Sequence, residues 1–191
     1  GKLDGSVRGG RVPAGLQPIF SANSPTLAEV GRDVNKFSNN VMAQQIFLTL
    51  ALQKNGVATR EGARAIVRQW WQERLPDAAP PQLDNGAGLS RSARISAQAL
   101  GRMLQSAWRA PVMPELAASL PILGVDGTLR RNQASAAGRA HLKTGSLRDV
   151  VAIAGYVDAP SGRRWVLVAL VNHPNAAAAR PALERLVEWV H

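Results

Sequence analysis

Residues 150–171 read VVAIAGYVDAPSGRRWVLVALV, and they contain the strongest strand pattern in the sequence. Two short runs, at 150–157 and 165–171, are rich in Val, Ile, Tyr and Trp, the composition typical of β-strands. The segment DAPSG at 158–162 separates them with turn-forming residues. The stretch therefore predicts a β-hairpin. Residues 140–143, which precede it, are predicted to add a further strand to an antiparallel sheet.

Before residue 125 the apolar spacing is that of helices. Ser24-Pro25 has the pattern of a helix start, with Ser as the N-cap and Pro at the first helical position. A second helix, over about 41–54, is apolar on most sides, which predicts that it is buried in a core. Asn55-Gly56 is expected to end it as a C-terminal cap.

Three more helices are expected on similar grounds. Thr59 can cap a helix with an amphipathic stripe, Ser96 can cap the next, and a short helix is expected at 114–119. After the hairpin, Leu183, Leu186, Val187 and Val190 form a last amphipathic helix. Helices, then about three antiparallel strands, then one helix make an α+β fold. One such helix covers only one face of the sheet, so the other face is expected to lack cover within this sequence.

Composition narrows the function classes. The 191 residues are 46% hydrophobic, which is typical of a globular protein, and no apolar run approaches the length of a membrane span. Zero cysteine excludes disulfides and thiol nucleophiles. The net charge of +10 leaves a nucleic-acid-binding domain as a weak alternative, because the arginines are dispersed and make no basic run. We therefore expect no nucleic-acid partner and no transmembrane segment.

Two short strings carry possible chemistry. Ser38-Asn39-Asn40 lies at a helix junction, where a structural N-cap is the simplest explanation. Lys143-Thr144-Gly145 ends a predicted strand, where a turn glycine is equally plausible. Each string alone is weak evidence for an active site. In this order they match two of the three motifs of penicillin-binding proteins and serine β-lactamases, with Ser-Asn-Asn in place of Ser-Asp-Asn.

The resemblance extends to longer segments. They resemble the class C low-molecular-mass penicillin-binding proteins, the D-alanyl-D-alanine carboxypeptidase/endopeptidase family of the penicillin-binding protein 4 type. The resemblance spans about residues 11–172 and is carried by residues 24–27, 35–40, 84–91, 120–129, 143–147 and 154–157.

The family's nucleophile motif, Ser-x-x-Lys, is missing. No serine of this sequence has a lysine three residues later. The resemblance therefore implies the C-terminal part of one penicillin-binding domain, without the N-terminal strands, helix and nucleophile segment. Residues 1–25 would be a returning linker or strand, 26–125 the helical lobe, and 139–191 the sheet and C-terminal helix. This chain alone is expected to be inactive.

The resemblance also implies roles for individual residues. Ser38 would relay a proton between the absent lysine and the leaving amine, and Asn40 would hold the substrate amide or position that lysine. Lys143 and Thr144 would bind the substrate's terminal carboxylate. Gly145 would allow close backbone approach, and the N–H of Ser146 would form half of an oxyanion hole.

The implied substrate is a peptidoglycan stem peptide ending in D-Ala-D-Ala, cleaved through an acyl-enzyme. β-Lactams would be inhibitors, the N-terminal remainder would be a partner, and the location would be periplasmic. No cofactor is expected. No metal site is expected either, because the three histidines are scattered, and His141 is predicted to be a surface residue. A non-catalytic peptidoglycan-binding relative stays an alternative, as does the weaker nucleic-acid-binding reading.

Overall fold

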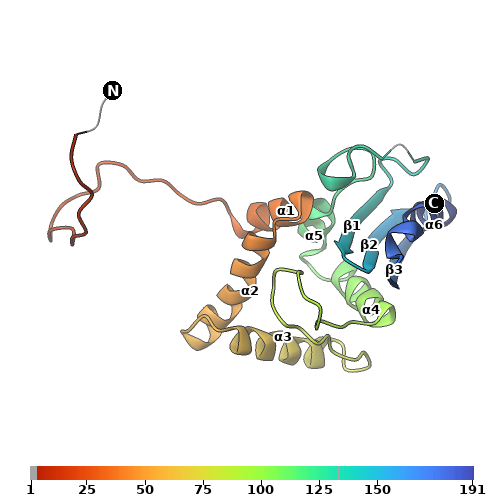
Figure 1. The fold of residues 1–191 in the computed structure, drawn as a ribbon, viewed down its shortest axis with the longest axis horizontal. Helices are drawn as coiled ribbons and strands as arrows, with labels where there is room; N and C mark the ends of the chain where they lie inside the picture. The colour runs from red at the N-terminus through yellow and green to blue at the C-terminus, as the bar shows by residue number, and fades with distance from the viewer. Residues whose placement is uncertain (1–3, 133) are drawn as a thin grey trace.

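The structure, a computed structural model, describes residues 4–132 and 134–191. Residues 1–3 of the segment predicted at 1–25, and residue 133 of the loop before the sheet, lie outside this range. Figure 1 shows a helical lobe beside a small sheet. The elements are α1 (Leu27–Phe37), α2 (Asn40–Asn55), α3 (Arg60–Arg74), α4 (Ala97–Trp108), α5 (Met113–Ser119), η1 (Gly127–Leu129), β1 (Ala140–Leu147), β2 (Val150–Asp158), β3 (Arg164–Asn172), η2 (Ala176–Ala179) and α6 (Arg180–Val190).

The sheet confirms the predicted α+β fold with three antiparallel strands. The strand order is β1-β2-β3, and β1 pairs residue by residue with β2 from Ala140↔Val157 to Leu147↔Val150. Strand β1 is four residues longer than predicted. The added half, from Thr144 onward, is polar and glycine-containing, so strand composition does not reveal it.

Helices cover both faces of the sheet. On one face, Leu142, Ile153 and Leu167 pack with Val187 of α6. On the other, Tyr156 packs with Leu100 and Leu104 of α4 and with Leu120, and its hydroxyl donates to the Leu104 carbonyl at 2.8 Å. The expectation that one face lacks cover is therefore wrong, because α4 returns to the sheet from the helical lobe. A cavity of about 370 Å³ remains on the α6 face, between the sheet and α6.

The prediction that helix α2 is buried is wrong for much of its surface. Only one side of α2 packs tightly, through Phe47 and Ala51 against Ala63 of α3. Val41 and Leu52 on its other sides are 71% and 46% exposed. Figure 1 shows the reason, since α2 and α3 form an outer corner of the lobe. Hydrophobicity predicts burial only where a packing partner is present.

The start of α1 also differs from the prediction. Its N-cap is Thr26 rather than Ser24, because Thr26 forms a capping box with Glu29. The hydroxyl of Thr26 accepts from the Glu29 N–H at 3.3 Å, and the Glu29 carboxylate accepts from the Thr26 N–H at 2.8 Å. The caps predicted at Gly56, Thr59 and Ser96 are confirmed.

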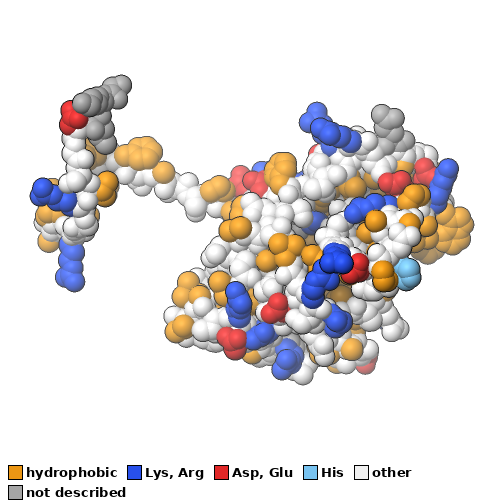
Figure 2. Space-filling model, in the orientation of Figure 1, with side chains coloured by type: hydrophobic (Ala, Val, Ile, Leu, Met, Phe, Trp, Pro, Cys, Tyr) orange, Lys and Arg blue, Asp and Glu red, His pale blue; other side chains and the backbone are white. Residues whose placement is uncertain are grey.

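Residues 4–25 form no helix or strand and run away from the rest of the chain (Figure 1). Among the described residues, no helix has the length and apolar character to cross a membrane. In Figure 2 the basic side chains lie at several separate places on the visible face.

The close contact of β1 with β2 depends on Gly155. Its φ is 152°, and a Cβ there would collide with the carbonyl of His141 in the neighbouring strand. We predict that Gly155→Ala destabilises the fold by about 3 kcal/mol, from backbone strain and overpacking. Urea unfolding followed by tryptophan fluorescence measures this loss.

Gly162 is the matched control. It also has a positive φ, 79°, but nothing lies within 4 Å of a Cβ at that position. Gly162→Ala therefore carries only the conformational cost, about 1 kcal/mol. Equal losses for the two variants would contradict the collision at Gly155.

Candidate functional site

The Ser38-Asn39-Asn40 string forms the junction between helices α1 and α2. Ser38 is the C-cap of α1, and its backbone is left-handed, with φ 53° and ψ 48°. Asn39 is the N-cap of α2, and its side chain accepts from the Met42 N–H at 3.0 Å. Asn40 is the first residue of α2. The structural interpretation as a cap is therefore correct for Asn39, and it leaves the side chains of Ser38 and Asn40 available for other contacts.

The left-handed backbone of Ser38 is unusual for a residue with a side chain. Of the described non-glycine residues, only Ser38 and Asp149 have positive φ. This conformation costs a non-glycine residue about 1–2 kcal/mol. Such strain persists only where the surroundings hold it, and it is often found at functional sites.

Lys143 meets Ser38 across the gap between the sheet and α1. Its Nζ donates to the Ser38 Oγ at 2.9 Å and to the Thr144 carbonyl at 2.9 Å. Side chains alternate along a strand, and Leu142 faces α6, so Lys143 faces the helical lobe. The fold thus brings together two motif strings whose contacting residues are 105 positions apart.

Lys143 is a partly buried cation. Burial lowers the pKa of its amino group. Its hydrogen-bond partners in the described part of the chain are both neutral oxygens, and no carboxylate there lies within salt-bridge distance. A desolvated ammonium without a counter-ion favours the approach of an anion.

Asn40 is fixed by the loop at 84–91. Its Nδ2 donates to the Ala87 carbonyl at 2.5 Å. The loop is itself held on α2, because the Gly86 N–H donates to the Gln44 Oε1 at 2.9 Å. With the amide nitrogen engaged, the Asn40 Oδ1 is the atom that can accept from another group. The structure gives no contact between Asn40 and Lys143.

The second half of β1 presents backbone groups at the sheet edge. The Leu142 N–H donates to the Pro121 carbonyl rather than to β2. Backbone groups of an antiparallel strand alternate between its two sides. The N–H and C=O groups of Thr144 and Ser146 therefore also face away from β2.

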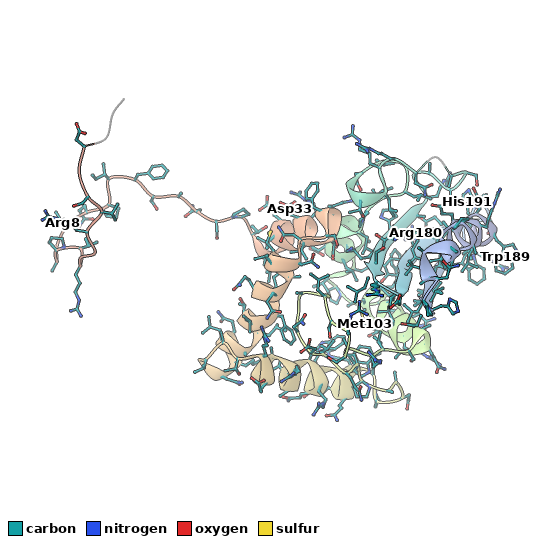
Figure 3. The ribbon with its side chains drawn as sticks, in the orientation of Figure 1. Arg8, Asp33, Met103, Arg180, Trp189 and His191 are labelled. Carbon is teal, nitrogen blue, oxygen red and sulfur yellow. The ribbon has the colours of Figure 1, made fainter. Side chains whose placement is uncertain are left out.

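The Ser146 side chain has a partner that the sequence analysis did not identify. Arg180, at the start of α6, donates from Nη2 to the Ser146 Oγ at 2.8 Å, and it lies beside the sheet in Figure 3. Thr144 and Arg180 both line the cavity on the α6 face. No spacing in the sequence connects positions 146 and 180, so this contact had no sequence signal.

A second cavity, of about 620 Å³, lies where the loop at 88–95 faces the end of β1. Gly145 and Ser146 line it on the strand side, and Arg91 and Arg94 on the loop side. The loop at 84–91 lies between α2 and this cavity. Gly88, Ser90 and Arg91 line the cavity, and Gly86 holds the loop on α2 through Gln44.

Two more residues near the site were missed. Lys36 and Asp126 form an ion pair at 2.6 Å between α1 and the loop after α5. Both residues lie in segments that carry the resemblance, 35–40 and 120–129, but no spacing in the sequence connects the two positions. His141 was expected at the surface, but it is half-buried, with Nδ1 3.0 Å from the Ala117 carbonyl. In the described residues, no three His, Cys, Asp or Glu side chains are grouped to hold a metal.

An antiparallel sheet between α4 and α6, with a Ser-x-Asn junction facing a Lys-Thr-Gly strand, is typical of penicillin-binding proteins and serine β-lactamases. Comparison with known proteins gives the family. The sequence matches the D-Ala-D-Ala carboxypeptidase 3 (S13) family over residues 1–191, and the chain belongs to this family.

Curated relatives show the same relationship. The chain is 30% identical to a D-alanyl-D-alanine carboxypeptidase of an Actinomadura species, over 98% of this chain and 37% of the relative. It is also 30% identical to the carboxypeptidase DacB of Mycolicibacterium smegmatis, over 92% of this chain and 40% of the relative. The chain thus spans about two fifths of the length of the relatives it matches, and it corresponds to their C-terminal part.

Solved structures agree on the fold. Penicillin-binding protein 4 of Haemophilus influenzae, in complex with a β-lactam, superposes with a TM-score of 0.73 at 21% identity, over 84% of this chain and 41% of that one. A penicillin G-acylated predatory endopeptidase of Bdellovibrio bacteriovorus gives 0.69 at 16% identity, over 86% and 45%. The predicted part of the penicillin-binding fold is confirmed.

We predict that the Lys143 amino group titrates below the ordinary range of a lysine, because burial lowers its pKa. The sequence has four lysines, so a ¹³C NMR titration of the Lys Cε signals resolves each of them. Lys143→Gln assigns the signal. A Lys143 titration within the ordinary range of a lysine would contradict the burial of this group.

Ser38 combines a strained backbone with a useful hydroxyl, and two substitutions separate these properties. Both Ser38→Gly and Ser38→Ala remove the hydroxyl that accepts from Lys143. Only glycine relieves the left-handed strain, so we predict that Ser38→Gly is more stable than Ser38→Ala by about 1 kcal/mol. Equal unfolding midpoints in urea would argue against strain at this position.

Proposed function

We propose that this chain is the C-terminal portion of the penicillin-binding domain of a serine D-Ala-D-Ala carboxypeptidase/endopeptidase. The observation that carries the proposal is the contact between Lys143 and Ser38, in which a partly buried ammonium lacks an anionic partner. The names of the relatives support the same activity. Two of them are carboxypeptidases by name, and one structural neighbour is a penicillin-acylated endopeptidase.

Lys143 and Thr144 would bind the terminal carboxylate of the stem peptide. Lys143 supplies positive charge from the lobe face of β1, and the Thr144 side chain approaches from the opposite face, so the carboxylate would lie at the strand edge. A charge-assisted hydrogen bond is roughly twice as strong as a neutral one. The same two groups would bind the carboxylate of a β-lactam, which makes β-lactams inhibitors of the intact enzyme.

The free edge of β1 would supply half of the oxyanion hole. The Ser146 N–H faces away from β2, so it can donate to an oxyanion that develops on the scissile carbonyl. Removing one such donor typically slows a reaction about 10²–10³-fold. Gly145 precedes it without a side chain, and this allows the substrate backbone to lie close to the strand.

Ser38 and Asn40 would serve proton transfer and positioning. The Ser38 hydroxyl accepts from Lys143, so its own proton can be donated to the leaving amine. Asn40 would use its amide oxygen, since its nitrogen is held by Ala87. The oxygen could accept from the substrate amide or from the lysine of a Ser-x-x-Lys motif.

The reaction itself needs a nucleophile outside this sequence. In the proposed mechanism, a serine of a Ser-x-x-Lys segment attacks the carbonyl between the two D-alanines. The terminal D-alanine leaves with a proton, and water then hydrolyses the acyl-enzyme. Peptidoglycan lies outside the cytoplasmic membrane, so a protein that acts on it would be exported, and we propose a periplasmic location.

A second candidate function is a non-catalytic peptidoglycan-binding protein. The chain itself carries the groups of β1 that such a protein would need, and it holds no Ser-x-x-Lys. Such a protein would keep the carboxylate-binding groups of β1 without a nucleophile. The two candidates differ in whether a penicillin becomes covalently attached.

Lys143→Ala tests the proposal in protein that includes the Ser-x-x-Lys segment. We expect the rate of labelling by a fluorescent penicillin to fall by at least about 10²-fold, because the carboxylate loses its charged partner. Far-UV circular dichroism checks that the variant folds. Lys54→Ala removes an exposed lysine and should label normally. Full labelling of Lys143→Ala would refute the role given to Lys143.

Intact-mass spectrometry before and after incubation with a penicillin separates the two candidates. We expect no adduct on the 20.4 kDa chain and one penicillin on a protein or fragment that carries the Ser-x-x-Lys segment. No adduct on either would favour the binding protein. An adduct on the 20.4 kDa chain would mean that its nucleophile lies within these residues.

A further inference from the structure

Lys36 is a buried lysine close to the site, and the proposed mechanism gives it no role. It is 8% exposed, the lowest exposure of any charged residue described. Its Nζ donates to the Leu120 carbonyl at 2.7 Å and to the Asp126 Oδ2 at 2.6 Å. The two acceptors come from opposite ends of the same loop, so Lys36 fixes both ends of it to α1.

Asp126 strengthens this attachment. Its second oxygen, Oδ1, accepts from the Ile122 N–H at 2.8 Å, so one carboxylate joins the loop to itself and to α1. Burial raises the pKa of the Asp126 carboxyl, but the hydrogen bonds from Ile122 and Lys36, with the charge of Lys36, outweigh this and lower it. Asp126 is therefore ionised at neutral pH and neutralises Lys36.

The loop lies tightly against α1 at its other end as well. Gly127 has a φ of 56°, and a Cβ there would lie 2.6 Å from the Lys36 carbonyl oxygen. On the same helix, the Asn35 Nδ2 donates to the Ser119 Oγ at 2.7 Å, just before the loop. The end of α1 that leads to Ser38 is thus held at several points by residues 119–127.

The same loop is bonded to the strand that carries Lys143. The Leu142 N–H donates to the Pro121 carbonyl at 2.9 Å, and the Leu123 N–H donates to the Ala140 carbonyl at 2.9 Å. Leu142 adjoins Lys143, and Lys36 lies two residues from Ser38. The loop at 120–127 is therefore a short, hydrogen-bonded bridge between the two elements that carry the site.

We propose that Lys36 is a positioning residue, which through Leu120 and Asp126 fixes the distance between Ser38 and Lys143. It acts through the loop and touches neither substrate nor the reacting atoms. The catalytic consequence of this proposal rests on the proposed function. The geometry involves only residues of this chain. Because a displacement of about 1 Å can slow a reaction about 10²-fold, a distant lysine can control the rate.

The test uses Lys36→Met, which keeps an unbranched side chain of similar length but removes the donor. Lys54→Met is the control, because Lys54 is exposed at the end of α2. Lys143 is observed directly by ¹³C NMR titration of the lysine Cε signals in the 191-residue chain. We expect its pKa to rise toward the ordinary lysine value in Lys36→Met, since a looser contact with Ser38 admits water, and to stay unchanged in the control.

Asp126→Asn is a second variant, and it keeps the shape and the Leu120 bond while removing the carboxylate's charge. It should shift the Lys143 titration in the same direction by less, and it decides the question if Lys36→Met does not fold. An unchanged Lys143 titration in the folded variants would overturn the proposal, even with a lower melting temperature. That result would make Lys36 a purely structural residue.

Penicillin acylation supplies a separate readout in protein that includes the Ser-x-x-Lys segment. We expect Lys36→Met to slow acylation about 10²-fold, with Lys54→Met unaffected. If the unmutated protein is not acylated at all, the proposed function fails, while the titration still decides whether Lys36 positions the site. An acylation rate in Lys36→Met equal to that of the unmutated protein would also overturn the proposal.

Discussion

The hydrogen bond from Lys143 to Ser38 joins the two halves of this structure. One partner lies at a helix junction and the other on an edge strand, and 105 positions separate them. The bond forms because the backbone of each partner is fixed, and the loop at 120–127 is bonded to both elements. Ser38 is held in a left-handed conformation between two helices, and the alternation of side chains along β1 directs Lys143 toward the lobe.

Side chains and backbone groups alternate in direction along strand β1, so the strand contributes to the hydrophobic core and to the candidate site. In its first half, Ala140 and Leu142 are fully buried on the α6 face, and their backbone groups bond the loop at 120–127. Further along, that loop no longer covers the edge, so the same backbone groups of Thr144 and Ser146 face outward. A strand can present a rigid row of donors to a ligand only where its neighbour on that side ends. The position of the site therefore follows from where the loop stops.

The sequence predicted the features that depend on local chemistry. The composition of the strands predicted the hairpin, and the capping residues Thr59 and Ser96 predicted where two helices begin. The motif strings gave Ser38 and Lys143, which the structure brings into contact. The sequence did not predict the exposure of α2. Hydrophobic side chains favour burial, but the sequence pattern does not tell which packing partners are present. Nor did it predict the contact of Arg180 with Ser146, because the tertiary fold determines which residues far apart in sequence meet.

Two lysines near the site differ in function because their environments differ. One stabilises the fold, and the other is available to bind a ligand. Lys36 is the more deeply buried, but Asp126 neutralises it, so its charge is satisfied within the fold. Lys143 is less buried, yet its partners are neutral oxygens. The free-energy cost of burying an ammonium without a counter-ion is offset only when an anion binds to it. Lys36 therefore contributes to the folded state itself, whereas the charge of Lys143 is available to a carboxylate.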